Sequence, residues 1–188
     1  MSSATQDQRE AVWIRQVAGG DRVAFENLFR AYQARVFHYI TRLLADRAAA
    51  EELTNDVLVE VWKSAGRYRG QSRLSSWVFG IAHHKVLNEW RRTRPKTVEA
   101  SEAHSLADPA QSPETRALQE SDRASIQAAL GELSLEHREV MELTFYQQRS
   151  CEEIAEIVHC PVNTVKTRMF HARKKLRDLL SAMGRGKT

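Results

Sequence analysis

The chain of 188 residues is poor in the features that mark secreted, membrane-spanning and zinc-bound proteins. Its two cysteines, Cys151 and Cys160, are too few for a disulfide framework and do not have the spacing of zinc ligands. No apolar run approaches the ~20 residues of a membrane span, and the N-terminus lacks the basic and apolar segments of a signal peptide. Glycine-rich phosphate loops, nucleophile elbows and paired-carboxylate sites are not evident. We therefore expect a cytoplasmic, non-enzymatic protein that uses no cofactor or metal and does not insert into membranes.

What the chain has in abundance is apolar spacing at the helical period, with almost no strand alternation. The pattern predicts an all-α fold of two small helical domains joined by a flexible linker. We expect the first domain over residues 9–94, the linker over 95–114 and the second domain over 115–184. The net charge is only +4, so the distribution of charge is more informative than its total.

Three long helices are predicted in the first domain. The first follows Asp21, the second begins near Arg47, and the third spans residues 77–92. The apolar face of the first consists of Phe25, Leu28, Phe29, Tyr32, Val36, Ile40 and Leu43. The linker segment has three prolines, four acidic residues and a single lysine, with no helical stripe.

Residues 150–177 predict a helix-turn-helix. Ser150 and Glu153 have the spacing of a capping box, His159 and Cys160 form the turn, and Pro161 suits a first helical position. The second helix has one buried stripe, formed by Val165, Met169, Ala172 and Leu176. Its other faces carry basic residues interleaved with Thr167, Phe170 and His171, a combination that suits a recognition helix in the major groove better than a merely solvated face.

Two other segments of the first domain have a marked composition. Residues 62–94 combine five aromatic residues with eight basic ones, which is typical of single-strand binding, although each aromatic taken alone is better explained by core packing. Residues 50–60 carry a strongly acidic helix face opposite Leu53, Val57 and Val61. Such a face cannot hold DNA; it is either solvated or docks on a basic partner, and composition alone favours solvation.

Taken in order, these segments resemble a bacterial sigma factor of the extracytoplasmic-function type, a minimal member of the sigma-70 family. The resemblance runs from about Gly20 to Leu180, apart from the linker. It is carried by four motifs: the opening helix from Gly20 to Tyr32; Glu51-Glu-Leu-x-Asn-Asp-Val-x-x-x-Val-Trp62; Tyr68-Arg-Gly-x-Ser72 with Ser76-Trp-Val-x-x-Ile-Ala82; and Leu133–Val140 with Glu153–Arg173.

The resemblance implies partners and site residues. It implies that the acidic helix binds the β′ clamp helices of core RNA polymerase, through Glu52, Asn55 and Asp56. It implies that the promoter −10 element is read by Tyr68, Arg69, Ser72, Trp77, His84, Arg91 and Arg92. The implied contacts to the −35 element are Asn163, Thr164, Lys166, Thr167, Phe170, His171 and Lys174. It further implies that the linker threads through polymerase, and that an anti-sigma factor controls the protein.

The chain departs from the family pattern at His84, where asparagine is usual, at Asn163, where glycine is usual, and at His171, where arginine is usual. Promoter preference therefore does not transfer from any relative. Two other functions stay open on the residues alone. One is a stand-alone helix-turn-helix regulator that dimerises on a palindrome. The other is a metal-dependent enzyme or redox sensor that uses Cys151, Cys160, His159 and His171.

Overall fold

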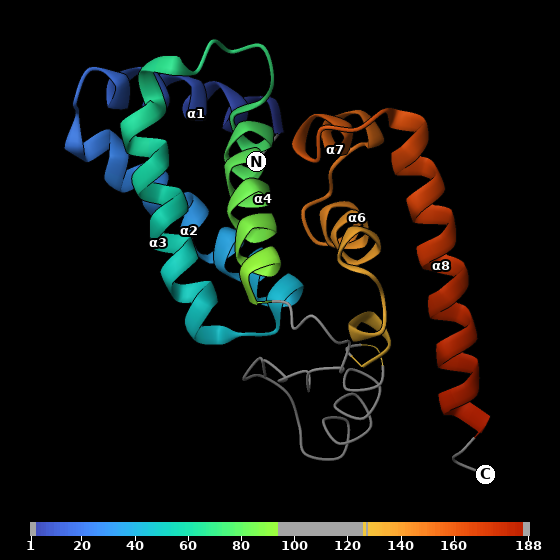
Figure 1. The fold of residues 1–188 in the computed structure, drawn as a ribbon. Coiled ribbons are helices and arrows are strands. Elements are labelled where there is room, and N and C mark those ends of the chain that lie inside the picture. The colour runs from blue at the N-terminus through green and yellow to red at the C-terminus, as the bar shows by residue number, and fades with distance from the viewer. Residues whose placement is uncertain (1–2, 94–125, 127, 186–188) are drawn as a thin grey trace, which may run out of the picture.

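The computed structural model describes residues 3–93, 126 and 128–185, and these contain helices and turns but no β-strand (Figure 1). The predicted linker, residues 95–114, lies outside them. The helices are α1 (Ser3–Ala18), α2 (Arg22–Leu44), α3 (Arg47–Ser64), α4 (Leu74–Thr93), α6 (Leu135–Phe145), α7 (Cys151–Ile157) and α8 (Val162–Arg185), with a short 3₁₀ helix at Ala65–Arg67. Within the described ranges, no helix is both long enough and apolar enough to cross a membrane.

Local capping sets where the central helices begin. The Asp21 carboxylate accepts hydrogen bonds from the backbone N–H groups of Val23 and Ala24 at the start of α2. Asp46 caps α3 in the same way through the N–H of Ala49. Between the two helices, Ala45 adopts φ +54° and closes the end of α2 with a bond from its N–H to the Thr41 carbonyl.

The predicted apolar face of α2 is confirmed along most of its length. Leu28, Tyr32 and Val36 are buried, as are Ile40 and Leu43 further along, whereas Phe25 and Phe29 are only half-buried. Phe25 packs edge-on against Trp62 of α3, with ring centroids 5.0 Å apart. Trp62 therefore packs in the core, as expected for each aromatic residue of the 62–94 segment taken alone.

Two helix boundaries differ from the expectation. Helix α4 begins at Leu74, three residues before the expected start, and α8 begins at Val162, so that Pro161 precedes the helix instead of occupying its first position. Pro161 still fits its place, because its carbonyl accepts the first helical bonds, from the N–H groups of Thr164 and Val165.

Helix α1 was not predicted. It packs against α2 and α4, where Ile14 and Val17 are buried (Figure 1). Glu10 is also buried, and its carboxylate accepts a 2.5 Å hydrogen bond from the Tyr32 hydroxyl. Burial, followed by the negative charge of Glu10, raises the pKa of Tyr32 far above its usual value, so the hydroxyl remains a donor.

The two halves of the chain pack directly on each other. Helices α6 and α7 lie beside α2 and α4, and α8 covers the far side of α6 and α7 (Figure 1). The buried side chains of α6 and α7, including Val140, Leu143 and Ile154, belong to the same apolar cluster as those of α2 and α4.

A buried carboxylate lies at the centre of this contact. Glu139 of α6 is 2% exposed and accepts hydrogen bonds at one oxygen from the Tyr39 hydroxyl of α2 and from Nδ1 of His83 of α4, the latter at 2.7 Å. Burial is the main reason why the pKa of Tyr39 is raised, with Glu139 second. A buried carboxylate without partners would be strongly destabilising, so these two donors determine where α6 sits on the first half.

Arginines add further links between the halves. Arg42 of α2 pairs with the buried Glu142 at 2.9 Å, and its guanidinium stacks on the Tyr146 ring at 3.6 Å. Arg138 of α6 donates to the Leu43 carbonyl at 2.9 Å, near the C-terminus of α2, where a cation is favourable. Arg149 reaches the Ser75 hydroxyl of α4 at 2.7 Å.

Replacing Tyr39 by phenylalanine tests this network. The change deletes one of the two donors to Glu139 and keeps the ring, so the free energy of unfolding should fall by about 1–3 kcal/mol in urea titrations. Tyr146→Phe is the matched control, because Tyr146 is exposed and its ring contact with Arg42 survives. Equal stability of the two variants would contradict the role given to Glu139.

Candidate nucleic-acid interface

The helix-turn-helix forms as its local sequence requires. The capping box is present in both directions: Glu153 N–H donates to the Ser150 hydroxyl, and Ser150 N–H donates to the Glu153 carboxylate. His159 turns the chain at φ +50° between α7 and α8. Val165, Met169 and Ala172 of α8 are buried, which confirms the predicted stripe, with Leu176 at its half-buried end.

The predicted −35 contacts lie on the exposed sides of α8. The exposed members are Asn163, Lys166, Thr167, Phe170, His171 and Lys174, whereas Thr164 is half-buried. Phe170 is 65% exposed, so its ring is accessible to a partner. The described part of α8 thus presents a polar and basic face that also carries an aromatic ring.

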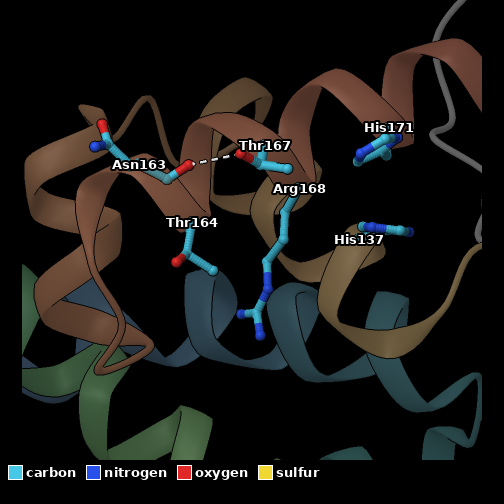
Figure 2. Close-up of a pocket in the computed structure, with 6 residues that line it drawn as sticks. All are labelled: His137, Asn163, Thr164, Thr167, Arg168 and His171. Carbon is cyan, nitrogen blue, oxygen red and sulfur yellow. Dashed lines mark hydrogen bonds between the residues drawn. The ribbon is translucent and has the colours of Figure 1, made fainter.

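A shallow open hollow of about 320 Å³ lies between this face and the start of α6 (Figure 2). Four of its lining residues belong to the predicted set: Asn163, Thr164, Thr167 and His171. The other two, His137 and Arg168, were not predicted. His137 comes from α6, and no short-range pattern in the sequence connects it to α8, which begins 25 residues later.

Positive groups dominate the surroundings of the hollow. Arg168 lines it (Figure 2). Arg168 also pairs with Glu136 at 3.3 Å, and Lys175 donates to the Glu132 carbonyl. Burial is the first cause of a lowered pKa of His137, and the nearby His171 is the second.

A second hollow gathers four of the seven predicted −10 residues. Tyr68, Arg69, Ser72 and Trp77 line it, together with Arg67 and Gln71. The Tyr68 hydroxyl donates to the Ser72 carbonyl at 2.6 Å, and the Tyr68 and Trp77 rings lie 5.3 Å apart. Burial and then Glu10 raise the pKa of Tyr68. Aromatic faces beside two arginines are a combination suited to an unstacked base and its phosphate.

The remaining three predicted −10 residues lie elsewhere on α4. Arg91 and Arg92 are exposed near the end of the helix, and Arg92 forms a two-pronged pair with Glu89 at 2.8 and 2.9 Å. His84 stacks on His159 of the helix-turn-helix, with ring centroids 5.0 Å apart and planes at 24°. Burial, followed by His159, lowers the pKa of His84.

The predicted polymerase contacts are all exposed on α3. Glu52, Asn55 and Asp56 face away from the core, and Asp56 is 56% exposed while paired with Lys85 at 3.2 Å. A surface pair of this kind contributes little to stability. The acidic face is therefore free for a basic partner at small energetic cost.

In the described ranges, no group of three or more His, Cys, Asp or Glu side chains could hold a metal ion. Cys151 and Cys160 are free thiols, both half-buried.

Comparison with known proteins identifies two regions in the chain. The sequence model of Sigma-70 region 2 matches residues 28–95, and that of Sigma-70, region 4 matches residues 123–176. The RNA polymerase sigma-H factor of Pseudomonas aeruginosa is 28% identical over 95% of this chain and 97% of its own length. The ECF RNA polymerase sigma factor SigL of Mycobacterium tuberculosis is 29% identical over 89% of this chain and 94% of its own.

Solved structures share the fold. CnrH in complex with the cytosolic domain of CnrY matches with a TM-score of 0.70 at 22% identity, over 93% of this chain and 98% of that one. The sigma factor RpoE of Bartonella quintana, in complex with the anti-sigma factor NepR, matches with a TM-score of 0.64 at 22% identity, over 84% of this chain and 96% of that one.

Proposed function

Because this chain belongs to the sigma-70 family of RNA polymerase sigma factors, with regions 2 and 4 in order, we propose that it binds core RNA polymerase and directs transcription initiation at promoters with −35 and −10 elements. The observation that carries the proposal is the presence of three separate exposed surfaces in one chain. They are the acidic face of α3, the aromatic hollow at Tyr68 and the recognition helix α8. A stand-alone regulator would use only the last of them.

Each surface is assigned one partner. Glu52, Asn55 and Asp56 bind the clamp helices of the β′ subunit, where a basic surface would replace the weak pairing with Lys85. Tyr68, Arg69, Ser72 and Trp77 hold an unstacked base of the −10 strand, and His84, Arg91 and Arg92 extend this contact along α4. The exposed side chains of α8, together with Thr164, contact the −35 element, with the start of the helix in the major groove.

Domain limits, location and regulation follow from the same assignment. We assign residues 9–94 to polymerase and −10 binding, 115–184 to −35 binding, and 95–114 to the connection between them. The protein acts in the cytoplasm with polymerase and performs no catalytic step of its own. An anti-sigma factor is its expected inhibitor, by analogy with the RpoE–NepR complex.

The packed arrangement of the two halves cannot be the form that reads both elements. Elements centred near −35 and −10 lie roughly 25 base pairs, or about 85 Å, apart at 3.4 Å per base pair. In the structure, His84 on the −10 side stacks on His159 beside the recognition helix, with ring centroids 5.0 Å apart. The halves must therefore separate. An extended connection of 20 residues reaches up to about 70 Å. Together with the widths of the two helical halves, this reach is sufficient to span the two elements.

Core binding should be lost when the acidic face is reversed. Asp56→Arg places a cation against a basic partner surface, so its affinity for core polymerase should fall at least tenfold in a fluorescence titration. Glu26→Arg makes the same charge change on α2, where Glu26 is exposed and pairs with Arg30 of its own helix, and should bind core normally. Wild-type affinity in Asp56→Arg would overturn the assignment of α3.

Separation of the two halves should be visible as a longer distance between them. With Cys151 and Cys160 replaced by serine, spin labels at exposed Glu26 and Glu156 report the separation of the two halves by pulsed electron resonance. Addition of core polymerase and promoter DNA should lengthen this distance by tens of ångströms. A label pair at Glu26 and Lys63, both in the first half, should not change. An unchanged distance between the halves in a transcribing complex would show that they do not separate, and would contradict this prediction.

A further inference from the structure

Two histidines from different helices face each other across the hollow beside the recognition helix. His137 lies in the first turn of α6, where its backbone N–H reaches the Ser134 hydroxyl at 3.4 Å, and His171 lies on α8. Their ring centroids are 6.4 Å apart with planes at 38° (Figure 2). This separation leaves room for one oxygen atom to accept an N–H bond from each ring, since such bonds span about 2.7–3.2 Å.

The charges around this pair favour an anion. Arg168 and Lys175 flank His137, and both, together with His171, disfavour a further positive charge on it. Glu136 acts in the opposite direction and has a larger effect on His137 than either cation alone, but the two cations together outnumber it, and it is paired with Arg168 at 3.3 Å. A bound anion would reverse the balance at His137, because its protonated ring would gain a negative partner.

We propose that His137 and His171 together bind one backbone phosphate of the −35 DNA, each ring donating one N–H to a phosphate oxygen. The proposal rests on the assignment of α8 to the −35 element and adds a contact from α6 to it. Phosphate contacts of this kind set the register of a recognition helix without reading sequence. The hydroxyls of Thr164 and Thr167 line the same hollow and offer further donors.

The position of the pair along the helices favours phosphate over a base edge. Residues near the N-terminus of a recognition helix contact bases, and His171 lies more than two turns beyond the start of α8. His137 is outside the helix-turn-helix altogether. A ligand shared by both rings must therefore lie at the edge of the groove, where the sugar–phosphate backbone runs.

The site makes DNA binding depend on pH. In the free protein the pKa of His137 is below its usual value, chiefly through burial, so the ring is mostly neutral near pH 7. Phosphate binding raises that pKa, so the complex takes up a proton. Affinity must then increase as the pH falls through the interval between the free and bound pKa values.

The test uses holoenzyme and a promoter fragment whose start site has been mapped by transcription. Fluorescence anisotropy is measured from pH 5.8 to 8.0 and over a salt series. Relative to wild type, His137→Gln should bind about tenfold more weakly at pH 6.0 and less than threefold more weakly at pH 8.0. At pH 6.0 the slope of log affinity against log salt should become shallower, by at most about 0.9, the value for one phosphate.

Two further variants separate the explanations. His137→Arg should recover the salt slope and lose the pH dependence, which a purely structural role for His137 would not produce. His38→Gln is the control, because His38 is exposed on α2, and its pKa is likewise lowered by burial and by Arg42; it should keep both wild-type slopes. Wild-type pH and salt slopes in His137→Gln would overturn the phosphate site while leaving the sigma function intact. If wild-type holoenzyme showed no promoter-specific binding, both proposals would fail.

Discussion

The buried carboxylate of Glu139 is the constraint on which the relation between the two halves depends. It lies 2% exposed between helices that are far apart in sequence, and Tyr39 and His83 both satisfy one of its oxygens. Burying a charge has a large desolvation cost, so such a contact specifies one orientation more than it adds net stability. When the halves separate, water can hydrate all three groups. The interface is therefore well defined and still able to open, as a protein that must span two promoter elements requires.

Local patterns were sufficient to predict most of the helices. The apolar stripes of α2 and α8 and the Ser150–Glu153 capping box are properties of neighbouring residues, and the structure confirms them. Helix α1 was missed although Glu10, Ile14 and Val17 have helical spacing. The reason is that Glu10, one of its three inward positions, is an acid, which does not look like a core residue until the hydrogen bonds from Gln6 and the distant Tyr32 are seen.

The candidate site was predictable in part for the same reason. Residues of α8 could be chosen from the helical period and their chemistry, and four of them meet in one hollow. His137 could not be chosen, because its position beside His171 is a consequence of how α6 packs on α8. Likewise, the sequence marked His84 only as a departure from a family pattern, whereas packing places it against His159. Tertiary contacts of this kind leave no short-range signal in a single sequence.

The central claim is that this chain gives polymerase its promoter specificity, and run-off transcription tests it most directly. Purified protein would be combined with bacterial core polymerase on fragmented genomic DNA, and the 5′ ends of the transcripts would be mapped. If the claim is right, discrete start sites appear, each preceded by one shared pair of −35 and −10 sequences, and they are absent when the protein is omitted. Start sites that are the same with and without the protein, together with no detectable binding to core polymerase, would contradict it.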